Sequence, residues 1–226
     1  MNSIIQSVKQ KGRSLYEYES LALLAEYGIT VQRHAFAADK REALQKADDI
    51  GYPLVLKIVS GDILHKSDAG GVVTGIKSPD QLEYHYDMMM KKIAAHQPDA
   101  KIKGVLLLEY AEQGIECIAG MIRDENFGPA LMFGLGGVWV ELFDDVSLEL
   151  LPVNRDDALR MIGATKAGKL LNGYRGGKRG DVSGMADLLV KLGRLAAENP
   201  EIKEIDLNPV FVYESGVLPV DARILV

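Results

Sequence analysis

Segments with helical periodicity alternate with short β-rich runs along almost the whole chain. The stretch "SLYEYESLALLAEYGI" places apolar residues at helical spacing and ends at Gly28, a typical helix stop. Further helical patterns cover 39–50, 79–96, 155–171 and 181–198. Strand patterns cover 30–36, 52–59, 72–77, 104–111, 114–122 and 129–134. This alternation predicts an α+β protein with two lobes, 1–106 and 107–226.

The composition fits a globular protein with a sizeable core, since 47% of the 226 residues are hydrophobic and 26% are charged. No apolar run reaches the roughly 18 residues needed to span a bilayer, and the N-terminal residues lack the pattern of a secretory signal. We therefore expect a cytoplasmic protein that has no membrane partner. The net charge of −6 argues against a nucleic acid partner, because phosphate-backbone binding needs a basic face.

The single cysteine, Cys117, cannot form an internal disulfide. It lies in the apolar run "GIECIAGMI", where a cysteine packs as a small apolar side chain. A reactive thiol is the alternative. The sequence therefore favours a buried, unreactive Cys117.

Two β-rich runs, "EIKEIDLNPVFVY" and "GVLPVDARILV", close the chain and predict a hairpin. Because strand side chains alternate between faces, Asp206 and Asn208 share one face, while Ile205 and Leu207 point into a core. A tight turn between the runs sets Asn208 roughly opposite Asp221. Oxygen ligands of this kind suit Mg²⁺, which proteins hold with one or two carboxyl groups completed by substrate phosphates. A solvated polar face is the alternative.

The stretch "KIVSGDILHKSDAGGVVTGI" joins two β-rich runs through a polar loop. Lys57 ends the first run, where a lysine either extends to water or points at an anion. Gly70 and Gly71 let backbone N–H groups close around a phosphate chain, although a plain turn explains them equally well. His65 is a candidate proton carrier, phosphate ligand or phosphoryl acceptor, with an ordinary loop residue as the alternative.

Three glycines, Gly134, Gly136 and Gly137, lie in the run "FGLGGVWVELFDD". They allow a loop that holds a phosphate or contacts a partner chain. A simple connection between strands is equally compatible with them.

Several motifs together resemble the ATP-grasp fold. They are "YPLVLK", "HKSDAGGV", the acidic residue ending "VLLLEY", and "EIDLNPVFV" followed by "LPVDARI". More narrowly, they resemble the β subunits of ADP-forming acetyl-CoA synthetases, in the NDP-forming acyl-CoA synthetase family related to succinyl-CoA synthetase. The resemblance covers roughly residues 15 to 226, and its specificity lies in the order and spacing of the motifs. It implies two α+β lobes that hold a nucleotide between them.

The resemblance also implies nucleotide contacts. Lys57 would contact the phosphates, and the loop around Gly70 and Gly71 would cover them. The segment Glu109, Tyr110 and Ala111 would meet the adenine through backbone and side-chain hydrogen bonds. Glu116 is a candidate ribose ligand, with a solvated strand residue as the alternative.

For the phosphoryl group, the resemblance implies that Asn208 and Asp221 bind Mg²⁺. Asp206 would orient an incoming phosphohistidine, although it is one methylene shorter than the glutamate common at this position. His65 matches a histidine proposed in the family as a second phosphoryl acceptor or relay. Catalysis would then consist mostly of positioning and charge neutralisation.

The implied reaction converts acyl-CoA, ADP and phosphate into acid, CoA and ATP, with ADP or ATP as substrate and Mg²⁺ as cofactor. A CoA-binding α subunit would carry the phosphorylated histidine, in a heterotetramer of two α and two β subunits. One alternative is an ATP-grasp carboxylate–amine ligase, for which the chain has little room. The other is a non-catalytic nucleotide sensor, which would be expected to lack Lys57, Asn208 or Asp221.

Overall fold

The computed structural model describes residues 2–63, 66–137 and 145–226. It divides into two compact units, one of Gln32–Glu112 and one of Met1–Val31 together with Gln113–Val226. This division differs from the expected lobes 1–106 and 107–226. The N-terminal residues belong with the C-terminal ones because α2 (Glu17–Glu26) packs against β10 (Arg223–Leu225). The smaller unit extends past residue 106 because β4 (Ile102–Glu109) is paired within its sheet.

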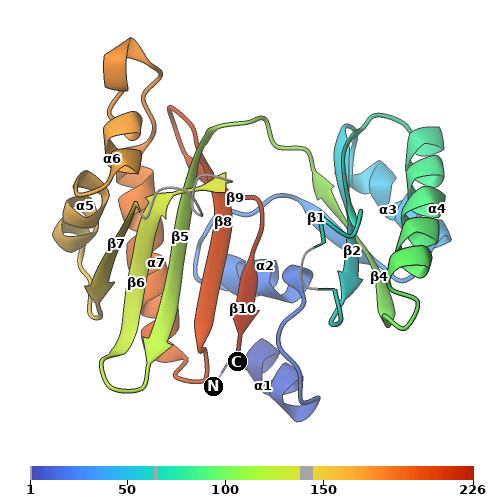
Figure 1. The fold of residues 1–226 in the computed structure, drawn as a ribbon, viewed down its shortest axis with the longest axis horizontal. Coiled ribbons are helices and arrows are strands. Elements are labelled where there is room, and N and C mark those ends of the chain that lie inside the picture. The colour runs from blue at the N-terminus through green and yellow to red at the C-terminus, as the bar shows by residue number, and fades with distance from the viewer. Residues whose placement is uncertain (1, 64–65, 138–144) are drawn as a thin grey trace. The chain divides into compact units, whose positions relative to one another are not determined.

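The smaller unit is an antiparallel four-stranded sheet covered by two helices (Figure 1). The strand order is β1-β4-β2-β3, with β1 at His34–Ala37, β2 at Leu54–Ser60 and β3 at Val72–Ile76. The helices are α3 (Lys40–Ile50) and α4 (Pro79–His96). Helix α4 has the predicted bounds, because Ser78 caps it by accepting a hydrogen bond from the Gln81 N–H at 3.2 Å. Strand β1 is shorter than the predicted 30–36.

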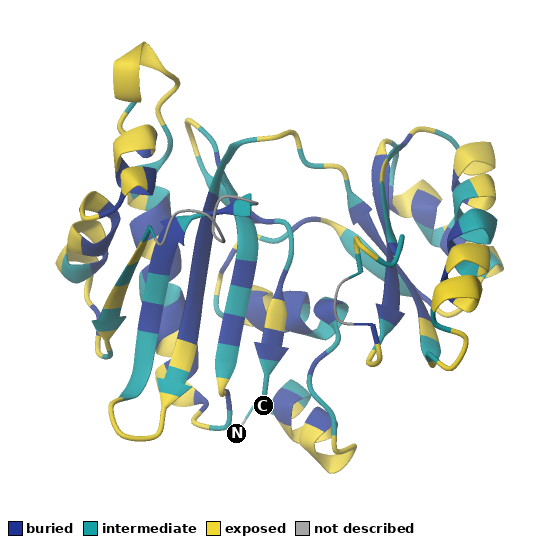
Figure 2. Ribbon diagram, in the orientation of Figure 1, coloured by how far each residue is buried: buried dark blue, intermediate teal, exposed yellow. Residues whose placement is uncertain are grey.

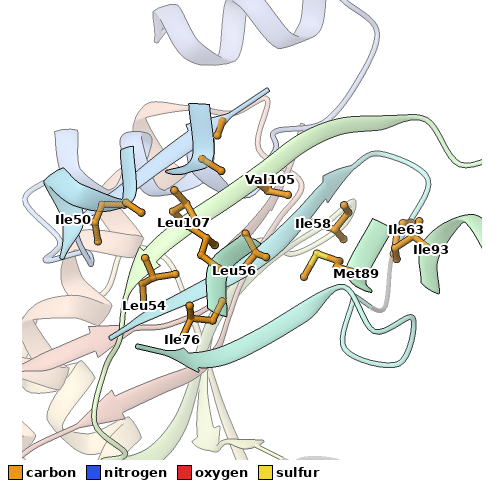
Figure 3. Close-up of a cluster of buried hydrophobic side chains, with 14 residues drawn as sticks. Ile50, Leu54, Leu56, Ile58, Ile63, Ile76, Met89, Ile93, Val105 and Leu107 are labelled. Carbon is orange, nitrogen blue, oxygen red and sulfur yellow. The ribbon is translucent and has the colours of Figure 1, made fainter. Parts of the chain in front are cut away.

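A hydrophobic core lies between this sheet and its helices (Figure 3). Alternate side chains of β2, Leu54, Leu56 and Ile58, are at most 1% exposed and pack against α4 residues that include Met89. Because neighbouring strand residues point to opposite faces, Lys57 lies on the face of the sheet away from this core.

The larger unit is built on a six-stranded antiparallel sheet of order β10-β8-β5-β6-β7, with β9 paired to β8. The strands are β5 (Ile115–Asp124), β6 (Gly128–Leu135), β7 (Val146–Leu150), β8 (Glu204–Val212) and β9 (Val217–Pro219). Helices α5 (Arg155–Gly163), α6 (Lys166–Leu171) and α7 (Val182–Glu198) pack against the sheet. No helix in the described residues is long and apolar enough to cross a bilayer.

Several elements of this unit depart from the sequence expectation, among them the closing run 216–226, which is divided into β9 and β10. Helix α1 (Ser3–Gln10) and the edge strand β7 were not predicted. In β7, Val146, Leu148 and Leu150 are exposed, so the strand lacks the usual pattern of an apolar face turned inward (Figure 2). The predicted helix 155–171 is two helices, because the Thr165 side chain caps α6 by accepting from the Gly168 N–H at 3.0 Å.

Candidate functional site

The C-terminal strands place three oxygen-bearing side chains together as predicted. Asp206 and Asn208 lie on one face of β8, and the residues that alternate with them, Ile205 and Leu207, are buried. Strands β9 and β10 pair with β8 in one common register, so Asn208 lies opposite Asp221 between the two paired segments.

Strand β8 carries a β-bulge beside this pair. Cys117 of β5 pairs with Val210, whereas Ala119 pairs with Leu207, so β8 has one extra residue at this point. Pro209 lies within the extra length, where the missing N–H costs no ladder hydrogen bond. Pro209 therefore marks a bulge and no sheet edge, because β8 lies inside the sheet.

Asp206 is in an environment that opposes its negative charge. Burial raises the pKa of the Asp206 carboxyl, and the charges of Asp221 and Glu204 raise this pKa further, against an opposite effect of Arg223. Its Oδ1 atom is buried and has no hydrogen-bond partner among the described residues. A cation or a hydrogen-bond donor at this point would relieve both features.

The oxygen ligands fit Mg²⁺. Asn208 and Asp221 supply an amide and a carboxylate oxygen, and beside them Oδ1 of Asp206 is a buried acceptor without a partner among the described residues. The described residues contain no group of three or more His, Cys, Asp or Glu arranged to hold a metal. Two protein ligands are fewer than the six that Mg²⁺ takes, so a Mg²⁺ ion held here would be completed by water and phosphate oxygens.

The glycine-rich loop after β6 joins this site through backbone hydrogen bonds. The Gly136 N–H donates to the Glu116 carbonyl at 3.0 Å, and the Gly137 N–H donates to Asn208 Oδ1 at 3.0 Å. The Glu116 carboxylate in turn accepts from Gln113 Nε2 at 3.1 Å. Both amides are engaged inside the protein, so neither of these two glycines offers its N–H to a phosphate; residues 138–144 of the same run lie outside the described residues. The sequence analysis did not predict that Gly137 contacts Asn208. The two adjacent glycines, Gly136 and Gly137, are the local feature that indicates such a close approach.

In the smaller unit, Lys57 is 7% exposed in the middle of the sheet. It pairs with Val72 on one side and Leu106 on the other. A lysine in such a position is costly unless its ammonium group has polar or anionic company. The burial argues against a side chain that simply extends to water.

Gly70 and Gly71 form the end of a Schellman turn. The Gly71 N–H donates to the Lys66 carbonyl at 2.7 Å, the Gly70 N–H donates to the Ser67 carbonyl at 3.0 Å, and Gly70 has φ +70°. A Cβ on Gly71 would lie 2.5 Å from Ile58 Cγ2. These glycines are therefore required by the turn and its close approach to β2, and their amides are not free for phosphate. His65, the candidate phosphoryl acceptor, lies outside the described residues.

The segment predicted to meet adenine follows β4. The Glu109 carboxylate forms a forked ion pair with Arg33, at 3.1 Å from Nε and 2.8 Å from Nη2, which lowers the pKa of this carboxyl. The Glu109 N–H donates to the Arg33 carbonyl, and the Tyr110 N–H donates to the Pro53 carbonyl. Ala111 follows in a segment without regular structure. The Glu109 side chain is thus engaged within the smaller unit.

A family model described as an ATP-grasp domain matches residues 6–226, which defines the class of this fold. The chain is 46% identical over 222 residues to the β subunit of acetate–CoA ligase (ADP-forming) I of Pyrococcus furiosus, covering 98% of this chain and 96% of that protein. It therefore belongs to the family of β subunits of ADP-forming acetate–CoA ligases, which implies a partner subunit.

Solved structures agree. The acetyl-coenzyme A synthetase 1 of Ca. Korarchaeum cryptofilum, in complex with coenzyme A, Ca-AMPCP and HgCl⁺, matches with a TM-score of 0.95 and 43% identity, covering 99% of this chain and 98% of that one. A second structure of this synthetase matches with a TM-score of 0.87 and 41% identity, covering 99% and 98% of the two chains. It holds coenzyme A and Mg-AMPPCP, and its phosphohistidine segment points towards the nucleotide binding site. The predicted fold and ligase family are confirmed, and the two alternative functions are set aside.

Proposed function

We propose that this chain is the nucleotide-binding subunit of an ADP-forming acyl-CoA ligase and transfers a phosphoryl group between a phosphohistidine and ADP. The observation that carries the proposal is the arrangement of Asn208 opposite Asp221, beside the buried and unpartnered oxygen of Asp206. Such a site supplies Mg²⁺ ligands and an acceptor for a proton-bearing group at one place.

Each proposed site residue of the larger unit has a distinct role. Asn208 and Asp221 hold Mg²⁺, which, when bound, neutralises charge on the phosphates. Asp206 accepts a hydrogen bond from the imidazole N–H of the incoming phosphohistidine, which orients the ring for transfer. Glu116 accepts hydrogen bonds from the ribose hydroxyl groups.

The smaller unit carries its own proposed nucleotide contacts. The ammonium group of Lys57 neutralises phosphate charge. Because the Glu109 side chain is paired with Arg33, adenine contacts fall mainly to the backbone of Tyr110 and Ala111.

Gly70 and Gly71 shape the loop that carries His65, and they do not donate amides to phosphate. His65 acts as a second phosphoryl acceptor or relay, and replacement of His65 by Ala should slow phosphoryl transfer far more than it weakens nucleotide binding.

The partner in this proposal is a CoA-binding α subunit that carries the phosphorylated histidine, in an assembly of two α and two β subunits. The support is the β-subunit name of the Pyrococcus relative and the phosphohistidine segment of the Korarchaeum enzyme.

The metal ligands give the direct test. In Asn208→Ala and Asp221→Ala variants, Mg-ADP affinity measured by calorimetry should fall to the level seen with EDTA, because the remaining ligand cannot offset the dehydration of Mg²⁺. Glu125→Ala and Asn126→Ala, in the exposed turn between β5 and β6, are matched controls that should bind normally. Wild-type Mg-ADP affinity in both site variants would refute the metal assignment.

A further inference from the structure

We propose that Gly137 is a positioning residue that couples the metal ligand Asn208 to the ribose ligand Glu116. This inference rests on the proposed function of the site. Gly137 acts in two ways: its N–H orients the amide of Asn208, and its lack of a side chain makes room for the carboxylate of Glu116.

The first contribution fixes which atom of Asn208 can meet a metal. The Gly137 N–H lies 3.0 Å from Asn208 Oδ1, and an N–H donor can face the oxygen of a carboxamide but not its NH₂ group. The amide oxygen has a second lone pair that remains available for Mg²⁺. If the amide turned over, it would present N–H groups to the cation. Gly137 therefore selects the binding orientation, as hydrogen bonds to ligating groups do at other metal sites.

The second contribution concerns space. Gly137 has φ +67°, and a Cβ at this position would overlap Oε2 of Glu116. The other carboxylate oxygen, Oε1, accepts from Gln113 at 3.1 Å. The carboxylate of Glu116 is thus held between Gln113 and the bare Cα of Gly137.

On its N-terminal side, Gly137 is attached to a residue with little room to move. The Gly136 N–H is bonded to the Glu116 carbonyl at 3.0 Å, and a Cβ on Gly136 would overlap the backbone of Cys117. A side chain at position 137 must therefore displace either the Glu116 carboxylate or the N–H that orients Asn208. In this way one residue links the two halves of the nucleotide site.

The test is the effect of Gly137→Ala on the gain in ADP affinity that Mg²⁺ provides. Calorimetric titrations of the full chain with ADP, in Mg²⁺ and in EDTA, give this gain as a ratio of dissociation constants. Alanine keeps the N–H, but a shift of the backbone at residue 137 draws this N–H away from Asn208. We expect the ratio to fall about 10-fold, the loss typical when a hydrogen bond behind a metal ligand is removed. A wild-type ratio in Gly137→Ala would overturn the inference.

Two further variants separate this role from general strain. Gly128 has φ +78° with open space around its Cα, so Gly128→Ala imposes a similar backbone cost and should keep the wild-type ratio. Glu116→Ala should weaken ADP binding with and without Mg²⁺. In the double variant Glu116→Ala/Gly137→Ala, the gain in ADP affinity from Mg²⁺ should be partly restored, because the methyl group at position 137 no longer overlaps a carboxylate at position 116. An equal loss in Gly128→Ala, or no recovery in the double variant, would contradict the coupling.

The same measurements distinguish this inference from the function on which it rests. If the wild-type chain gains no ADP affinity from Mg²⁺, the proposed function fails. If the wild-type chain shows the gain and Gly137→Ala shows it equally, only the role of Gly137 fails.

Discussion

At the scale of single residues, the most informative group is the carboxyl of Asp206. Its pKa is raised by burial first and by the nearby Asp221 and Glu204 carboxylates next, so its charged form destabilises the metal-free fold. Its buried Oδ1 has no partner among the described residues. Under the proposed function, this cost to stability is accepted because the oxygen is kept for binding the incoming phosphohistidine.

Replacing this charge should stabilise the metal-free chain. We expect Asp206→Asn, measured by urea unfolding in EDTA, to raise the free energy of unfolding by roughly 1 kcal/mol at neutral pH. Because the folded pKa is raised, the wild-type penalty is present above that pKa and disappears as the pH falls towards about 4, the ordinary pKa of aspartate. The gain should therefore shrink on acidification. A gain that grows at low pH would contradict the assignment.

Cys117 gives a second prediction at this scale. Its side chain is fully buried, and burial, assisted by the charge of Asp145, raises the pKa of the thiol to about 12. The thiol should therefore react with a disulfide reagent such as DTNB only after the chain unfolds. Rapid labelling of the native protein would disprove this. The expectation that Cys117 packs as a small apolar residue is confirmed by its burial.

At the scale of elements, glycines decide how loops meet strands. The loop before β3 closes with a Schellman turn, and Gly71 approaches Ile58 of β2 more closely than any side chain would allow. The sequence left a phosphate loop and a plain turn equally open for these glycines, and the turn gives a structural reason for both of them.

This close approach predicts a difference between two nearby glycines. Gly71→Ala should lower the free energy of unfolding by about 1 to 3 kcal/mol, the usual cost of overpacking, because the new methyl group meets Ile58 Cγ2. Gly61→Ala is the matched control, since a Cβ there has no neighbour within 4 Å. Both values come from urea unfolding curves. Equal effects of the two substitutions would show that the contact with Ile58 is unimportant.

At the scale of the whole molecule, the chain has a nucleotide-binding fold and belongs to a family of β subunits. The proposed reaction also needs sites for CoA and for the acyl group, which we assign to the partner. The isolated chain should therefore bind Mg-ADP but should form no acyl-CoA until a CoA-binding α subunit is added, as followed by the loss of the free CoA thiol. Full turnover by the purified chain alone would contradict this division of labour.

Much of the site could be predicted from local patterns. The bounds of α4 follow from Ser78 and Pro79, and the faces of β8 follow from the alternation of Asp206 and Asn208 with buried neighbours. The position of Asn208 opposite Asp221 follows from a short connection between two strands. These features depend on residues close in sequence, so periodicity and turn length determine them.

Only the tertiary structure decided the contacts between distant segments. The hydrogen bond of Gly137 to Asn208 joins residues 71 positions apart, and the ion pair of Arg33 with Glu109 joins residues 76 apart. Likewise, α2 belongs with the C-terminal strands because it packs against β10, nearly the full chain length away. Such contacts depend on the summed packing of whole elements and leave no periodic trace in the sequence. The sequence by itself therefore determined the ligands of the proposed site, and tertiary packing determined how those ligands are held.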